Sequence, residues 1–312
     1  MGGGQALVLP MRECCQSPNP VSIERMELFD THAHFTLAEG WRESFAGMLS
    51  RAREASLVGL LAVGGTPELN DGAMSFARLV REGGDAGFDV RVALGFERDQ
   101  ATAFPSPDCV ALALAGAFDE AGKEGPPPVA VGEIGLDYAV CELPSGAQRG
   151  LFAREVAFAA ERGLPVCVHS RAADADTIDV LRSEGSGALA DDGRLGVLHC
   201  FTGDEAFARA VLDLGMYVSF SGILTFRNAD ALRTVARFVP ADRLLIETDC
   251  PYLAPVPVRG KVNEPAFVAH TAACLASQRG WTLRETAETT LANARRLFGI
   301  GEEQGGLGRG SD

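Results

Sequence analysis

The stretch FDTHAHF at residues 29–35 decides the fold, because a short apolar strand leads there directly into two histidines. In an extended backbone, side chains two residues apart point to the same face, so His32 and His34 can bind one ion at the end of a strand. Two ordinary polar residues that leave a strand would give the same pattern. The rest of the chain has to decide between these interpretations.

Apolar strands alternate with helices along the whole chain. The further predicted strands are short and almost entirely apolar, which is typical of parallel strands buried on both faces. They lie at residues 57–63, 89–95, 129–134, 165–168, 195–198, 216–220 and 244–246. Helical spacing occurs at residues 40–55, 66–82, 107–121, 145–163, 172–183, 204–214, 228–238, 264–279 and 282–298.

This alternation of about eight strand–helix units predicts an α/β fold, a single parallel (β/α)₈ TIM barrel. A doubly wound open sheet is the alternative. Its nucleotide-binding versions need a glycine-rich turn after the first strand, and none follows residues 29–35 here. The barrel is therefore the favoured fold.

The length of 312 residues fits one barrel without a second core. We expect the barrel domain at residues 26–299, with a poorly ordered N-terminal extension at residues 1–25 and a glycine-rich flexible tail at residues 300–312. Met26 would make a natural start for the first strand. Hydrophobic residues make up 46% of the chain and charged residues 22%, as in a globular protein with a large core.

Composition also bears on location and partners. No apolar run approaches the roughly 18 residues needed to cross a bilayer, and the N-terminus lacks the pattern of a signal peptide. The eight cysteines show no repeating CxxC pattern, and Cys167, Cys200 and Cys250 are expected to be buried reduced thiols. We therefore predict a cytoplasmic protein with no membrane association and no obligate protein partner. The net charge of −14 disfavours the coating of long polyanions, although a local basic mouth is compatible with it.

Polar residues with metal-binding side chains occur where the predicted strands end. A barrel gathers the carboxyl ends of its strands at one mouth, so these side chains should converge. Any one of them alone would be read as a hydrogen-bonded core residue or a turn cap, but without a metal the whole set would leave charges and polar groups unpaired. The predicted metal ligands are His32, His34, Glu133, His169, His199 and Asp249.

This set exceeds what one tetrahedral ion uses, which predicts two divalent ions that share a carboxylate. Glu133, near the middle of the set, is the expected bridge, and Asp249 is expected both to hold a metal and to accept a proton from water. Glu133 and Asp249 are therefore the predicted catalytic residues. Two ions would activate the water and take up charge on the attacking and leaving oxygens. Mixed histidine and carboxylate ligation suits Mg²⁺, Mn²⁺ or Zn²⁺ without choosing among them.

Six motifs follow one another between about Met26 and Gly299. They are FDTHAH at 29–34, VGEIGLDY at 131–138, PVCVHSR at 165–171, LHCFTG at 198–203, LIETDCPYL at 245–253 and RGKVNEP at 259–265. In this order they resemble the TatD-related metal-dependent deoxyribonucleases. The resemblance implies a TIM barrel of the amidohydrolase kind, the same six metal ligands, and hydrolysis of phosphodiester bonds.

One motif departs from that pattern. The family usually carries Gly-Val-His-Pro at the end of its third strand, whereas residues 94–98 read LGFER here. The missing histidine would line the substrate side of the mouth, and Glu97 places a negative charge where a phosphate is expected. Basic residues elsewhere would offset the charge of a phosphate. The predicted substrate-binding residues are Arg171, Arg227, Arg259 and Lys261.

The predicted function is a metal-dependent deoxyribonuclease that works 3′ to 5′ on single-stranded DNA or frayed 3′ ends, with the polarity implied by the resemblance alone. One alternative is hydrolysis of another ester or amide, including the ester of D-aminoacyl-tRNA. Sites bridged by a carbamylated lysine are disfavoured, because neither Lys123 nor Lys261 lies at a predicted strand end. A non-catalytic metal-binding barrel would be expected to have lost a ligand or the candidate base, and this chain has lost neither.

Overall fold

The computed structural model describes residues 26–84, 87–125, 127–185 and 192–301. Within these residues, eight parallel strands form one sheet whose order follows the chain. The strands are β1 (Leu28–Ala33), β2 (Leu57–Gly65), β3 (Asp89–Phe96), β4 (Ala130–Asp137), β5 (Val166–Arg171), β6 (Gly196–Leu198), β7 (Tyr217–Phe220) and β8 (Leu244–Ile246).

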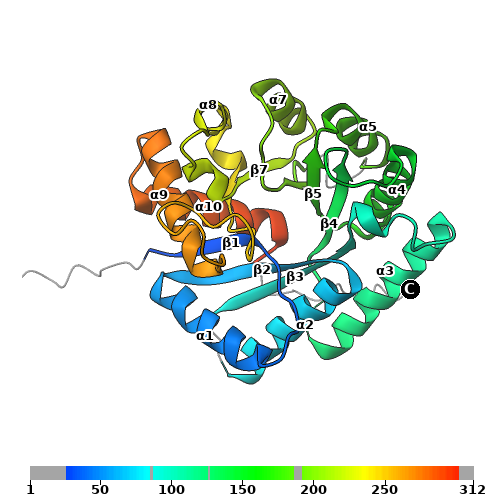
Figure 1. Ribbon diagram of the computed structural model, residues 1–312, viewed down its shortest axis with the longest axis horizontal. Coiled ribbons are helices and arrows are strands. Elements are labelled where there is room, and N and C mark those ends of the chain that lie inside the picture. The colour runs from blue at the N-terminus through cyan, green and yellow to red at the C-terminus, as the bar shows by residue number, and fades with distance from the viewer. Residues whose placement is uncertain (1–25, 85–86, 126, 186–191, 302–312) are drawn as a thin grey trace, which may run out of the picture.

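The sheet closes on itself beyond the end of β8. Ala33 of β1 forms a parallel bridge with Cys250, and the Asp249 N–H donates to the His32 carbonyl at 2.9 Å. Helices surround the closed sheet (Figure 1). The predicted (β/α)₈ TIM barrel is thus confirmed, and the open doubly wound sheet is wrong.

The helices follow the strands in turn along the chain. They are α1 (Trp41–Glu54), α2 (Pro67–Glu82), α3 (Pro107–Glu124), α4 (Ser145–Arg162), α5 (Asp174–Glu184), α7 (Glu205–Asp213), α8 (Asp230–Phe238), α9 (Val268–Arg279) and α10 (Leu283–Phe298). Short 3₁₀ helices are η1 (Arg98–Gln100), η2 (Gly222–Thr225), η3 (Ala241–Arg243) and η4 (Pro265–Phe267). The predicted helix at 264–279 is therefore two elements, η4 and α9.

Alternate residues of each strand pack in opposite directions, as the pleat requires. Phe29, Tyr217 and Leu245 belong to an interior cluster that also contains Leu297 and other residues of α10. Their strand neighbours belong to the larger cluster beneath the surrounding helices. In α10, the Asn293 side-chain amide donates to the carbonyl of Leu244, where β8 begins. Helix α10 therefore closes the amino-terminal end of the barrel, and the polar site lies at the other end.

Four strands run past the ends that the sequence predicts, and two of them, β4 and β5, do so by three residues. β4 and β5 remain paired as far as Asp137 and Arg171, so Glu133 and His169 lie inside their strands and not at the ends. The prediction was wrong here because it ended each strand where apolar residues gave way to polar ones, although backbone pairing does not depend on apolar side chains. The register shifts between Gly132 and Ile134, and such an irregularity re-aims the side chain it contains.

The predicted extension at residues 1–25 and residues 302–312 of the predicted tail lie outside the described residues, so the domain boundaries stay a prediction. None of the described helices combines the length and apolar character that crossing a membrane requires. The cysteines of the described part are free. Cys167 and Cys250 are buried as predicted, whereas Cys200 is partly exposed.

Candidate metal centre

Glu133 lies at the centre of the predicted site, and its two carboxylate oxygens face different pairs of histidines. Oε2 is 3.3 Å from His32 Nε2 and 3.1 Å from His34 Nε2. Oε1 is 3.3 Å from His169 Nδ1 and 3.4 Å from His199 Nε2. One buried carboxylate thus lies between four imidazole nitrogens.

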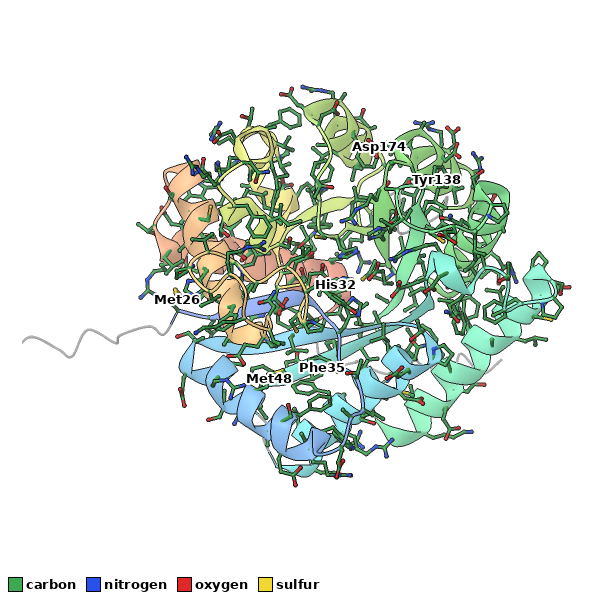
Figure 2. All side chains as sticks on the ribbon, viewed as in Figure 1. Met26, His32, Phe35, Met48, Tyr138 and Asp174 are labelled. Carbon is green, nitrogen blue, oxygen red and sulfur yellow. The ribbon has the colours of Figure 1, made fainter. Side chains whose placement is uncertain are left out.

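Asp249 joins the cluster from the loop after β8, with Oδ1 3.7 Å from His34 Nε2. The structure therefore brings all of the predicted metal ligands together, and Figure 2 shows His32 in the middle of the barrel. Potential ligand atoms lie within 4.8 Å of one another in two groups that include only predicted residues: His32, His34 and Asp249, and Glu133, His169 and His199.

Hydrogen bonds to groups outside the ligand cluster orient two of the histidine rings. His34 Nδ1 is 2.9 Å from the Val63 carbonyl, which places the ring proton on Nδ1 and leaves Nε2 toward the cluster. His169 Nε2 is 3.2 Å from Asp137 Oδ2, which leaves Nδ1 toward the central carboxylate. Asp137 is itself held by the Ala139 N–H at 2.9 Å. Each ring therefore presents a lone pair to the centre of the site.

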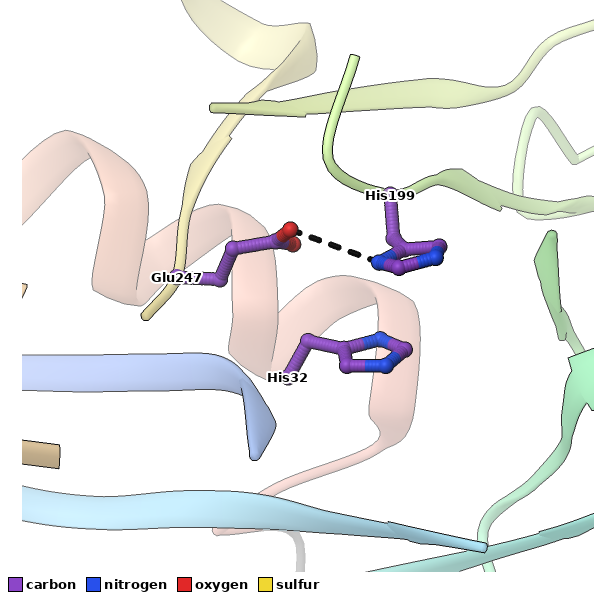
Figure 3. A group of neighbouring side chains, drawn as sticks. All are labelled: His32, His199 and Glu247. Atoms are coloured by element: carbon purple, nitrogen blue, oxygen red, sulfur yellow. Dashed lines mark ion pairs between the residues drawn. The ribbon is translucent and has the colours of Figure 1, made fainter. Parts of the chain in front are cut away.

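Sequence reasoning missed Glu247 and Asp137, although both lie within the quoted motifs. His199 Nδ1 is 3.4 Å from Glu247 Oε1, and the His199 ring stacks on His32 with centroids 3.8 Å apart (Figure 3). Together, His32, His199 and Glu247 form a third group of potential ligands. Strand alternation was the signal available, because Glu247 directly follows β8 and continues the alternation that places Leu245 in the barrel interior.

Several buried polar atoms of this cluster have no hydrogen-bond partner. Among the described residues these atoms are His32 Nδ1 and Glu247 Oε2, together with both ring nitrogens of His199, which lie 3.4 Å from carboxylate oxygens of Glu133 and Glu247 without forming a hydrogen bond. Unpartnered buried polar atoms are costly, and a cation among them would satisfy lone pairs that the protein leaves open. Imidazole and carboxylate donors are also the ligands that divalent ions use. The described residues thus form a His/Glu/Asp cluster able to bind metal.

Comparison with known proteins agrees with this geometry. The family model for TatD related DNase matches residues 29–299. The chain belongs to this family. An uncharacterized metal-dependent hydrolase of Bacillus subtilis, YabD, is 35% identical over 274 residues, which cover 88% of this chain and 99% of YabD. The resemblance inferred from the motifs is thus confirmed.

Two further TatD proteins are similar to this chain. The 3′-5′ ssDNA/RNA exonuclease TatD of Klebsiella pneumoniae is 37% identical over 183 residues, which cover 56% of this chain and 66% of that protein. The crystal structure of YJJV, a TatD homolog from Escherichia coli, has a TM-score of 0.73 and 27% identity, covering 88% of this chain and 98% of that one. Fold and family therefore agree over most of the chain.

Burial and local charge give Glu133 and Asp249, the two predicted catalytic carboxylates of this TatD-family site, different pKa values. Burial would raise the pKa of Glu133, but charge interactions and hydrogen bonds with His199, His32 and His34 lower it well below its ordinary value. Burial raises the pKa of Asp249 to about 6, although the charges of His199 and His34 act to lower it. Without a bound ion, Asp249 is therefore the more basic of the two carboxylates.

The end of β3, where this chain departs from the usual TatD pattern, carries a charge pair. Arg98 Nη1 is 2.7 Å from Glu97 Oε2 and 3.1 Å from Glu133 Oε1. The negative charge of Glu97 is thus compensated by its neighbour in the chain. The sequence analysis missed Arg98, because the contact with Glu133 depends on the packing of β3 beside β4.

The four cations predicted to bind substrate lie outside this buried cluster. Arg171 is the last residue of β5, Arg227 follows η2, and Arg259 and Lys261 lie in the loop after β8. All four have exposed side chains, and the Arg259 guanidinium lies over the Phe226 ring, 3.9 Å from its centroid. They therefore lie at the end of a strand or in the loops that follow the strands, where an extended substrate could contact them.

Proposed function

We propose that this TatD-family protein is a metal-dependent 3′-5′ deoxyribonuclease that hydrolyses phosphodiester bonds in single-stranded DNA or at frayed 3′ ends. The observation that carries the proposal is Glu133, whose two oxygens each face a separate pair of histidines. This arrangement supports two divalent ions that share one carboxylate. The similarity to a relative named as an ssDNA/RNA exonuclease supports the choice of substrate.

The two groups of ligands suggest how the ions would be shared. His32, His34 and Asp249 would hold one ion, His169 and His199 would hold the other, and Glu133 would contact both. The ions would be Mg²⁺, Mn²⁺ or Zn²⁺, since the donor set suits all three. When bound, they supply Lewis acidity to phosphoryl oxygens and lower the pKa of a water molecule.

The protein's own groups would orient the metal-binding histidine rings and deprotonate the attacking water. Asp249 would accept the proton of the attacking water as a general base. Val63, Asp137 and Glu247 would keep three of the rings in the orientation that the cluster needs. We assign the cytoplasm as the compartment, because the described cysteines are free thiols.

Substrate would reach this centre across the loops that follow the strands. Contacts between exposed cations and phosphates position a strand without reading its sequence. The exposed side chains at this end of the barrel would bind phosphates of the DNA further along than the phosphate being cleaved. They are Arg171, Arg227, Arg259 and Lys261.

Nucleotide release from a 3′-labelled single-stranded DNA tests the proposal. Metal-stripped protein is resupplied with Mg²⁺, Mn²⁺ or Zn²⁺ in turn, and His169→Ala protein serves as the control that lacks one ligand. We expect metal-dependent release that is lost in the control. Stoichiometric metal binding without any cleavage of DNA would contradict the nuclease and point to another ester or amide substrate.

A further inference from the structure

The charge pair at the end of β3 lies on one side of the central carboxylate. Arg98 Nη1 donates to Glu133 Oε1 at 3.1 Å and forms an ion pair with Glu97 Oε2 at 2.7 Å. The Arg98 side chain is 19% exposed, so solvent ions screen these contacts only in part. The positive charge of Arg98 is therefore held against Oε1, the oxygen of Glu133 that faces His169 and His199.

The two oxygens of Glu133 define two candidate ion sites. The Oε2 site consists of Glu133 Oε2, His32, His34 and Asp249, and the Oε1 site consists of Glu133 Oε1, His169 and His199. The Oε2 site thus contains a second carboxylate, whereas the Oε1 site has a guanidinium beside its single carboxylate oxygen. A divalent ion would gain more electrostatic energy at the Oε2 site.

The charge pair also reaches from the side of β2 to the side of β4. The Glu97 N–H donates to the Gly65 carbonyl at the end of β2 at 2.6 Å, and a Cβ on Gly65 would lie 2.6 Å from Glu97 Oε1. β2 pairs with β1, which leads into His34, whereas β4 pairs with β5, which carries His169. The negative end of the pair therefore lies toward the Oε2 site, and the positive end, Arg98, lies toward the Oε1 site.

Two further acids lie behind the rings of the Oε1 site and act in the opposite direction. Asp137 Oδ2 is 3.2 Å from His169 Nε2, and Glu247 Oε1 is 3.4 Å from His199 Nδ1. These carboxylates would make the rings better ligands, but each lies on the far side of an imidazole from the ion. Arg98 contacts a ligand oxygen directly, and its effect is larger because the Coulomb energy falls with distance.

We propose that Arg98 makes the two ion sites unequal, so that one ion binds first and tightly at the Oε2 site and a second binds weakly at the Oε1 site. Arg98 lowers the affinity for the second ion by about tenfold to a hundredfold, the usual effect of a change beside a metal ligand. The inference rests on the proposed function, in which both ions take part, and adds the order in which they bind. Cleavage then depends on the supply of the second ion, so the concentration of free divalent metal regulates the site.

Calorimetric titration of metal-stripped protein with Mn²⁺ tests the order of binding. In wild type we expect one tight and one weaker binding event. Electron paramagnetic resonance should show an isolated Mn²⁺ ion after the first event and a spin-coupled pair after the second. His169→Ala should lose the weaker event and keep the tight one, whereas Asp249→Asn should weaken the tight one. Two events of equal affinity in wild type, or loss of the tight event in His169→Ala, would overturn the inference.

Substitutions of the charge pair test its cause. Arg98→Met should tighten the weaker event about tenfold or more, whereas Arg98→Lys, which keeps the charge, should stay close to wild type. The double variant Glu97→Gln/Arg98→Met should also bind the second ion more tightly than wild type, which separates the loss of the Arg98 charge from the effect of an unpaired Glu97. The tight event should remain in all three variants and shows that the site is folded. An unchanged weaker event in both Arg98→Met and the double variant would overturn the inference.

A surface variant and a separate assay complete the test. Arg182→Met, on α5 where the Arg182 side chain is 64% exposed, should bind both ions like wild type. Release of nucleotides from 3′-labelled DNA is measured on the same samples. Two unequal binding events without cleavage would support the binding order and contradict the nuclease, whereas cleavage with two equal events would overturn this inference alone.

Discussion

Asp249 illustrates at the scale of one residue how position and charge combine in the site. It is buried beside His34 and has the higher pKa of the two predicted catalytic carboxylates. We expect Asp249→Asn to lower kcat by roughly 10²- to 10⁴-fold, the usual effect of losing a general base. Thermal unfolding should be close to that of wild type, because the amide is isosteric with the carboxylate. Full activity in the variant would rule out Asp249 as the base.

Glu155, on α4, is a buried acid outside the metal cluster. Its Oε1 accepts the Phe96 N–H, and its Oε2 has no hydrogen-bond partner among the described residues. Burial raises the pKa of Glu155 well above its ordinary value, so the folded state keeps a proton that the unfolded state releases. The free energy of unfolding should therefore fall by about 1.4 kcal/mol per pH unit above the unfolded pKa, until the folded pKa is reached.

Glu155→Gln removes this titration. Urea denaturation at about pH 5 and about pH 8 should show the variant gaining stability over wild type at the higher pH, since only wild type then has to retain a buried proton. If the two proteins differed in stability by the same amount at both pH values, the raised pKa of Glu155 would be contradicted.

Helix α10 shows how a single element completes the barrel. The side chains of Thr282 and Glu285 form a capping box at its start, and Gly299 ends it with a φ of 63°. Leu297 is buried in the cluster that fills the barrel interior. We expect Leu297→Ala to lower the free energy of unfolding by about 2–5 kcal/mol through the cavity it leaves. Leu112→Ala on α3, where the side chain is 73% exposed, is the matched control and should change stability by less than about 0.5 kcal/mol.

The stability of the whole molecule should depend on metal, because the cluster joins five of the eight strands or the loops that follow them. A ligand that binds only the folded state adds about 2.7 kcal/mol at a hundred times its dissociation constant. We therefore expect chelation to lower the melting temperature and resupplied Mn²⁺ to restore it. His169→Ala, which lacks one ligand, should respond less. If metal binding were shown directly but the melting temperature did not change, the placement of the metal in this cluster would be contradicted.

The sequence by itself determined the barrel and most members of the His/Glu/Asp cluster at its mouth. Apolar strands alternating with helices admit few arrangements, and histidines placed near strand ends must meet when parallel strands close into a barrel. Local signals also located α10, since Thr282 and Gly299 are typical of helix ends.

Only the tertiary structure decided which atoms of these residues meet. The register shift beside Glu133 turns its two oxygens toward different histidines, and Arg98 reaches Glu133 across 35 residues of sequence because β3 and β4 are neighbours. The pairs of Glu247 with His199 and of Asp137 with His169 arise in the same way. Side-chain direction and long-range contact depend on how strands pair, and residue spacing along one chain does not contain that information.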